Sequence, residues 1–148
     1  MNAAPLPRIA WWLGYGGLIP FVVLSAAVVL GMDSPGFTAT DAVSALLRYG
    51  AVIISFIGAV HWGVALSVAP PDKRNAMFVY SVIPALAAWL LLFFTAQVAL
   101  VGMAVTVVVA FFTDQVLLFA QVHPDYRRLR LQLTVVVAAS LLAAARFA

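Results

Sequence analysis

The segment YGAVIISFIGAVHWGVAL (residues 49–66) decides what kind of fold this chain can adopt. It is apolar throughout except for Tyr49, Ser55 and His61, and no other ionisable residue occurs up to position 69. At about 1.5 Å per helical residue, such a segment crosses about 30 Å of hydrocarbon. The segment therefore predicts a transmembrane helix, and a histidine in its middle is the feature that a functional interpretation has to explain.

The remainder of the chain has the same apolar character. Of its 148 residues, 66% are hydrophobic and 9% are charged, and the mean hydropathy is +1.11. Soluble domains carry about 25% charged residues, and a small soluble fold leaves too much surface in water to hide so many apolar side chains. The sequence has no cysteine, which excludes a disulfide framework and a thiolate metal site. Two distant histidines and one carboxylate do not make a zinc ligand set, so no metal or cofactor is predicted.

Five apolar segments predict five transmembrane helices within a single membrane domain, residues 1–148. They are expected at residues 9–30, 42–69, 76–94, 98–122 and 131–145. Pro, Gly and Asp dominate the first two breaks, as turns require. The break at residues 95–97 is needed because an unbroken helix across both neighbouring segments would be about 70 Å long. We therefore expect an all-α integral membrane bundle whose first segment is not a cleaved signal peptide.

The basic residues predict how this bundle is oriented. Under strict alternation, six of the eight Lys and Arg residues fall on one side of the membrane. Cytoplasmic loops carry the excess of these residues, so the N-terminus is expected inside and the C-terminus outside. Membrane lipids are the expected partners, because the basic residues do not form the continuous stripe that nucleic acid requires. Anionic headgroups are expected to meet five of them: Lys73, Arg74, Arg127, Arg128 and Arg130.

Four of the predicted spans place a polar side chain at a similar depth from the cytoplasmic side. Tyr15, His61, Tyr80 and Asp114 lie seven to nine residues from the nearest polar break, which is about 10–13 Å. A carboxylate in hydrocarbon is unfavourable by about 2.5–3.5 kcal/mol, so it faces the bundle interior and finds a partner. We expect His61 and Asp114 to face each other, with the two tyrosines lining the same pocket.

Three further residues are assigned to this polar layer. Gln115 is a possible second donor to the carboxylate, and Gln121 extends the polar face of the same helix towards the cytoplasm. Trp62 either lines the layer beside His61 or faces lipid.

The helix predicted at residues 42–69 carries small residues on two faces. Gly58 shares one face with His61. On roughly the opposite face, Ser55, Ala59 and Gly63 form a small-xxx-small ridge, the pattern that lets helices approach closely. We therefore expect this helix to be central, with neighbours on both sides.

Two classes of function stay open from these residues. In the first, the polar layer binds a proton, a small ligand or the headgroup of a quinone-like lipid, because intramembrane ionisable residues usually mark functional sites. In the second, the His61–Asp114 pair only joins helices, contributing about 1 kcal/mol or less, and the chain is a structural or assembly subunit or a homo-oligomer. No motif places Ser55 or Ser81 beside His61, so no catalytic residues are predicted and an enzyme is less favoured.

The segments WLGYGGLIPF (residues 12–21), YSVIPALAAW (residues 80–89) and HPDYRRLRLQLT (residues 123–134), together with the opening segment and Asp114, resemble the family of transmembrane protein 69. The resemblance covers nearly the whole chain. It implies a small multi-span protein of the bacterial inner membrane, related to a mitochondrial inner-membrane protein, and it supplies no reaction. Asp125 departs from the family pattern, which has an aromatic residue before the tyrosine.

Overall fold

The computed structural model describes residues 5–148, and within this range it contains six α-helices and no strand. The helices are α1 (Arg8–Gly16), α2 (Ile19–Val29), α3 (Ala39–Ser67), α4 (Pro71–Leu91), α5 (Ala96–Leu117) and α6 (Pro124–Ala145). Five helical stretches are long and apolar enough to cross a membrane, with α1 and α2 forming one of them. The predicted all-α bundle of five spans is therefore confirmed.

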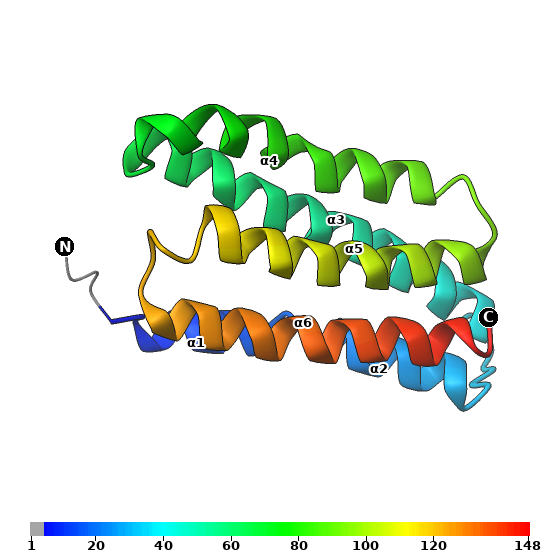
Figure 1. Ribbon diagram of the computed structural model, residues 1–148. Coiled ribbons are helices and arrows are strands. Elements are labelled where there is room, and N and C mark those ends of the chain that lie inside the picture. Colours follow the sequence, from blue (N-terminus) through cyan, green and yellow to red (C-terminus); the bar gives the residue numbers. More distant parts are fainter. Residues whose placement is uncertain (1–4) are drawn as a thin grey trace.

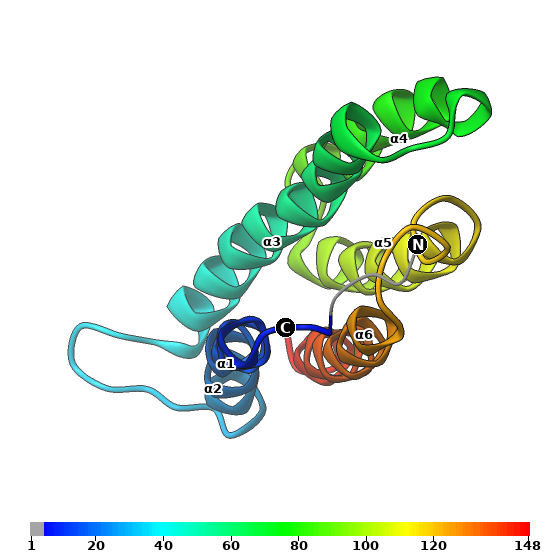
Figure 2. The same cartoon turned by 90° about the vertical axis from the view of Figure 1, so that its left-hand side faces the viewer.

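Figure 1 shows the helices running alongside one another, with the two chain ends at opposite ends of the bundle. α3 packs along α4, α5 packs along α6, and α2 contacts both α3 and α6. Figure 2, the view turned by 90°, shows α3 crossing obliquely past the other helices. The main core consists of buried aliphatic and aromatic side chains that include Phe21, Leu46, Ile54, Met103 and Leu141. Which end of this bundle faces the cytoplasm stays a prediction.

The first span, predicted at residues 9–30, consists of two helices. α1 ends at Gly16 and α2 begins at Ile19, with Pro20 in its first turn. Proline lacks the N–H that would continue a helical ladder, so it suits the start of a new helix. The Tyr49 hydroxyl donates a hydrogen bond of 3.0 Å to the Gly17 carbonyl. This bond satisfies a backbone acceptor at the break, as an interruption at membrane depth requires.

Two helices begin at least five residues earlier than the sequence predicted. α4 begins at Pro71 rather than at residue 76, and α6 begins at Pro124 rather than at residue 131. In both cases proline occupies the first turn, where its missing N–H has no intrahelical partner to lose. His123 Nδ1 accepts from the Asp125 backbone N–H at 3.2 Å and caps α6. Residues 126–130, predicted as a loop, are therefore helical.

α3 is the longest helix, at 29 residues, and it begins with a capping box. The Thr38 hydroxyl oxygen accepts from the Asp41 backbone N–H at 3.2 Å, and an Asp41 carboxylate oxygen accepts from the Thr38 backbone N–H at 2.9 Å. This reciprocal arrangement satisfies two otherwise free backbone donors and fixes where α3 starts. It thereby fixes the depth at which the residues further along α3 enter the bundle.

Candidate functional site

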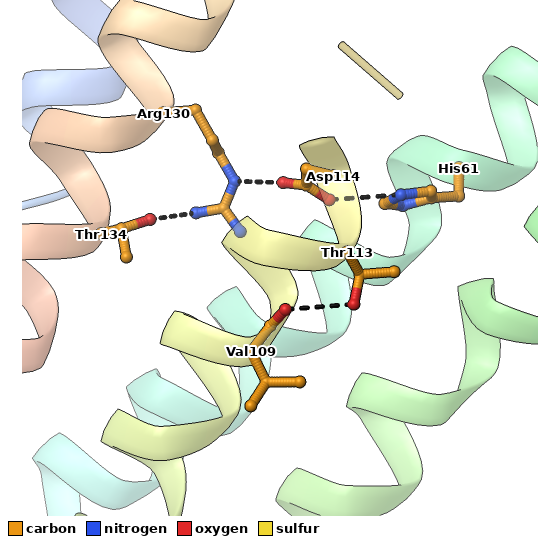
Figure 3. Close-up of polar contacts among 6 residues, drawn as sticks. All are labelled: His61, Val109, Thr113, Asp114, Arg130 and Thr134. Carbon is orange, nitrogen blue, oxygen red and sulfur yellow. Dashed lines mark hydrogen bonds and ion pairs between the residues drawn. The ribbon is translucent and has the colours of Figure 1, made fainter. Parts of the chain in front are cut away.

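Asp114 on α5 lies between a histidine from α3 and an arginine from α6 (Figure 3). Its Oδ2 atom accepts a hydrogen bond of 3.0 Å from Arg130 Nε, and its Oδ1 atom lies 3.2 Å from His61 Nε2. Arg130 Nη1 donates to the Thr134 hydroxyl at 3.0 Å. The exposed fractions of His61, Asp114 and Arg130 are 0%, 1% and 6%. One buried carboxylate therefore links three helices, and we call these three residues the ionisable cluster.

Local helical geometry explains how this cluster is held. Arg130 and Thr134 are four residues apart on α6, so their side chains share one face of the helix. Asp114 lies in the last turn of α5, where its backbone carbonyl accepts from the N–H groups of Leu118 and Phe119 at 2.9 and 2.8 Å. The Tyr80 ring packs edge-on against the His61 ring, with 4.8 Å between centroids. Each member of the cluster thus comes from a regular helix rather than from a mobile loop.

Several polar atoms of the cluster have no directed hydrogen bond within residues 5–148. They are His61 Nδ1, His61 Nε2, Asp114 Oδ1 and Arg130 Nη2. The His61–Asp114 distance suits an ion pair, which exists only when the imidazole is protonated, and the geometry does not suit a directed hydrogen bond. A buried polar group without a partner is unfavourable by about 1–3 kcal/mol. The cluster therefore leaves part of its hydrogen-bonding capacity unused within the described residues.

A cavity of about 430 Å³ borders the cluster on the side of Arg130. Its wall is otherwise almost entirely apolar and is built by α1, α2, α3, α5 and α6; it includes Leu13, Phe21, Ile57, Val60, Val107 and Leu133. Tyr126, one helical turn before Arg130 on α6, also lines it. Pockets for small molecules usually span about 300–1,000 Å³, so the cavity has a suitable size for a ligand.

The structure brings together only part of the predicted polar layer. His61, Asp114 and Tyr80 meet, but the Tyr15 hydroxyl donates to Gln132 Oε1 at 2.7 Å on the exposed side of α6. The prediction that Tyr15 lines the pocket is therefore wrong. α1 ends at Gly16, and Tyr15 in its last turn directs its side chain towards α6. Trp62 is 49% exposed and packs its ring against Phe78 at 5.1 Å, so it faces outward rather than into the cluster.

The two predicted glutamines do not join the cluster. Gln115 and Gln121 are half-buried, and neither makes a side-chain hydrogen bond within residues 5–148. Asp114 takes its second partner from α6 instead. Residue 115 follows Asp114 directly on α5, and adjacent helical positions do not face the same way. No side-chain hydrogen bond therefore connects Asp114 with Gln121 in the described part of the chain.

The two faces of α3 behave differently. Gly58 is buried, and a Cβ atom there would overlap the Ser81 carbonyl oxygen, so this glycine allows α3 and α4 to approach closely. On the ridge, Ala59 and Gly63 are exposed, and a Cβ at Gly63 would meet nothing within 4 Å. The Ser55 hydroxyl bonds to the Ala51 carbonyl of its own helix at 2.8 Å. The ridge therefore has no helix packed on it within residues 5–148, contrary to the prediction.

The basic residues are also divided differently from the prediction. Arg130 does not lie at the headgroups, because α6 begins early enough to carry it into the bundle towards Asp114. Arg74, Arg127 and Arg128 are exposed. The Lys73 ammonium donates to the Val116 carbonyl at 2.8 Å and so covers the last turn of α5.

Sequence reasoning missed Arg130, Thr134 and Tyr126 as members of the site. The signal that was available is the dipeptide His123-Pro124, since Pro is favoured in the first turn of a helix. Starting the last helix there places Arg130 about 9 Å from its first residue, in the layer of His61 and Asp114. A lone carboxylate in hydrocarbon also calls for a cation, and Arg130 is the nearest one by this count.

Comparisons with known proteins agree with this architecture. Residues 6–146 match the family model described as Protein of unknown function (DUF3429). Transmembrane protein 69 of Xenopus tropicalis is 36% identical over 139 residues, which is 91% of this chain and 53% of that protein. The chain thus spans about half the length of this curated relative, and no solved structure matches it. The chain belongs to the DUF3429 family and is a multi-pass membrane protein similar to transmembrane protein 69.

Proposed function

We propose that this protein, resident in the bacterial inner membrane, binds a proton or the polar head of a small membrane-soluble ligand, such as a quinone-like lipid, at the ionisable cluster. The observation that carries this proposal is the burial of three ionisable side chains in one contact group that still has unpartnered polar atoms. Intramembrane ionisable residues are energetically unfavourable, so they are usually paired and commonly mark functional sites.

The energy balance favours a binding role over helix packing. Asp114 and Arg130 already neutralise each other at 3.0 Å, so charge pairing alone does not require a third ionisable group. His61 is nevertheless fully buried beside them, and its Nδ1 atom has no partner within residues 5–148. A polar contact between membrane helices stabilises their association by about 0.6 kcal/mol on average. This gain is smaller than the unfavourable free energy of burying an ionisable group.

The histidine content of the chain allows a direct test. The sequence has only two histidines, so ¹⁵N-histidine NMR of the protein in lipid nanodiscs gives two imidazoles to assign. His123→Asn identifies the second imidazole and keeps a side chain suited to capping α6. We expect the His61 signals to change when the pH is varied or when an extract of bacterial membrane lipids is added. Signals that respond to neither would assign the cluster to helix packing.

A structural or assembly role is the second candidate, and the exposed ridge of α3 supports it. Ala59 and Gly63 are small residues on the exposed surface of α3, and small residues let another helix approach closely. The chain has no cysteine, so Gly63→Cys introduces a single thiol for cross-linking in native membranes. A cross-linked product at Gly63→Cys but not at the exposed control Leu131→Cys would favour this role. Equal products from both variants would count against it.

Membrane lipids are the proposed partners of the exposed basic residues. Arg127 and Arg128 project from the first turns of α6, and Arg74 lies in the first turn of α4, at the same end of the bundle. Each basic residue near an anionic surface contributes about 1 kcal/mol of attraction. These residues would hold that end of the bundle at the headgroups. The ionisable cluster would then lie deeper in the membrane.

A further inference from the structure

We infer that the ligand of the ionisable cluster is an uncharged amphiphile whose apolar body occupies the 430 Å³ cavity and whose carbonyl-type oxygen accepts a hydrogen bond from Arg130. This inference rests on the proposed binding function of the same cluster and names the chemical class of its ligand. Three features of the described residues lead to it: a free donor, a balanced charge and an apolar wall that reaches the lipid-facing surface.

The free donor belongs to the guanidinium of Arg130. Two of its nitrogens are occupied, Nε by Asp114 and Nη1 by Thr134, as Figure 3 shows. The third, Nη2, is buried and has no partner within residues 5–148, and another part of the Arg130 side chain lines the cavity. A ligand oxygen therefore reaches Nη2 once the guanidinium turns towards the cavity. A guanidinium only donates, so the missing partner has to be an acceptor such as a carbonyl, ester or quinone oxygen.

The charge of the cluster favours an uncharged head. Arg130 and Asp114 cancel, and the other polar groups against them are the imidazole of His61, the hydroxyls of Tyr80 and Thr134, and the nearby Tyr126. With a neutral imidazole, the buried site therefore has no net charge. A carboxylate head would add an uncompensated negative charge in a region of low dielectric, which is strongly unfavourable unless His61 took up a proton.

The wall of the cavity favours a long apolar body. Leu13 from α1 and Phe56 from α3 line it, and both are largely exposed on the surface of the bundle. In a membrane this surface meets acyl chains, so the cavity is continuous with the lipid phase rather than with water. Apolar lining with one or two placed polar groups is typical of sites that select a ligand by its head and hold it by its body.

The test compares three probes on the full-length protein by native mass spectrometry. Decylubiquinone supplies a quinone head, methyl palmitate an acyl ester, and palmitic acid the same chain with a charged head. Ala10→Phe fills the cavity from α1 without touching the cluster, and Ala139→Phe is the matched control on an exposed face of α6. The double variant Asp114→Leu/Arg130→Met removes the donor and its counter-charge together.

We expect at least one uncharged probe to bind wild type and Ala139→Phe equally. Its binding should be at least about tenfold weaker in Ala10→Phe and in the double variant, because the apolar site or a hydrogen bond to a charged donor is lost. Binding of decylubiquinone alone would identify a quinone head, and binding of methyl palmitate alone an acyl ester.

The inference is overturned if Ala10→Phe binds as tightly as wild type, or if palmitic acid binds more tightly than its methyl ester. It is also overturned if no uncharged probe binds. In that case a His61 NMR signal that still changes with pH would leave the proposed proton site standing, whereas a His61 signal without any response would remove the proposed function as well.

Discussion

Arg130 on α6 donates to Asp114 on α5 across 3.0 Å, and the two side chains are almost completely buried. This ion pair sets the character of the site, because it allows a carboxylate to stay within the apolar part of the bundle beside His61. Buried pairs of this kind are sensitive to the loss of one partner and tolerant of the loss of both. The first prediction follows from this difference.

Arg130→Met should destabilise the protein by about 3–5 kcal/mol, because it leaves Asp114 buried and unpaired. The double variant Asp114→Leu/Arg130→Met should recover most of this loss. Reversible unfolding in mixed micelles measures both effects. Arg128→Met is the matched control, since Arg128 is exposed and its replacement should change stability by about 0.5 kcal/mol or less. A double variant as unstable as the single one would contradict the pairing.

Gly58→Ala should loosen the contact between α3 and α4. Its Cβ would overlap the Ser81 carbonyl oxygen and lie 3.3 Å from Pro84 Cδ, so the two helices would have to separate. We expect a loss of about 1–3 kcal/mol, as for other overpacked sites. Gly63→Ala on the same helix meets open space and should raise stability slightly, by up to about 1 kcal/mol. Equal effects at the two glycines would show that α3 and α4 do not pack as described.

Tyr49→Phe should destabilise the break between α1 and α2. The lost hydroxyl leaves the Gly17 carbonyl without this donor, at an expected loss of about 1 kcal/mol. Tyr15→Phe removes a hydroxyl bonded to Gln132 at the exposed surface and should have little effect on unfolding. If both phenylalanine variants unfold like wild type, the hydroxyl of Tyr49 is not needed at the break.

Reporter fusions at Asp33 and Asp72 should give opposite readouts. The two residues lie in or beside the connections at opposite ends of α3, and the excess of basic residues predicts that Asp72 is on the cytoplasmic side. A reporter active only in the periplasm, fused after each position, checks this orientation. Identical readouts would contradict a membrane crossing by α3.

Arg127→Gln/Arg128→Gln should loosen the anchoring of α6 and move part of the population to an altered C-terminal location. These two exposed arginines provide the attraction to anionic headgroups near α6, about 1 kcal/mol each. A C-terminal reporter measures the location. Arg130→Met serves as the comparison, because it should lower stability without changing orientation. An unchanged location in the double glutamine variant would indicate that this end binds a protein instead.

The sequence predicted the number and type of the spans because composition and periodic breaks determine them directly. It also predicted that His61 and Asp114 share a depth, because depth depends only on residue count along alternating helices. It failed for Tyr15, since shared depth does not fix the direction of a side chain, and α1 turns that residue towards Gln132.

The hydropathy pattern places Arg130 at the lipid headgroups, and this prediction fails for a different reason. Hydropathy places the start of the last span at residue 131, because the charged residues before it resemble a loop. The structure starts α6 at Pro124, so the helix carries Arg127 and Arg128 exposed near its beginning and Arg130 buried further along. Arg128 differs from Arg130 in its angular position around the helix, whereas Arg127, three residues before Arg130, differs from it mainly in its position along the helix axis, and hydropathy reports neither.

The pairing of Asp114 with Arg130 also bears on how the chain enters the membrane during synthesis. Inserted alone, α5 would carry a carboxylate into hydrocarbon and α6 would carry a guanidinium. Each insertion would be unfavourable by about 2.5–3.5 kcal/mol. Only residues 118–123 join these helices, so the two charges meet as soon as the helices fold back on each other. Insertion of α5 and α6 as one hairpin therefore cancels both charges in a single step. α3 precedes both helices in the chain, so it has already been synthesised when they pack against it.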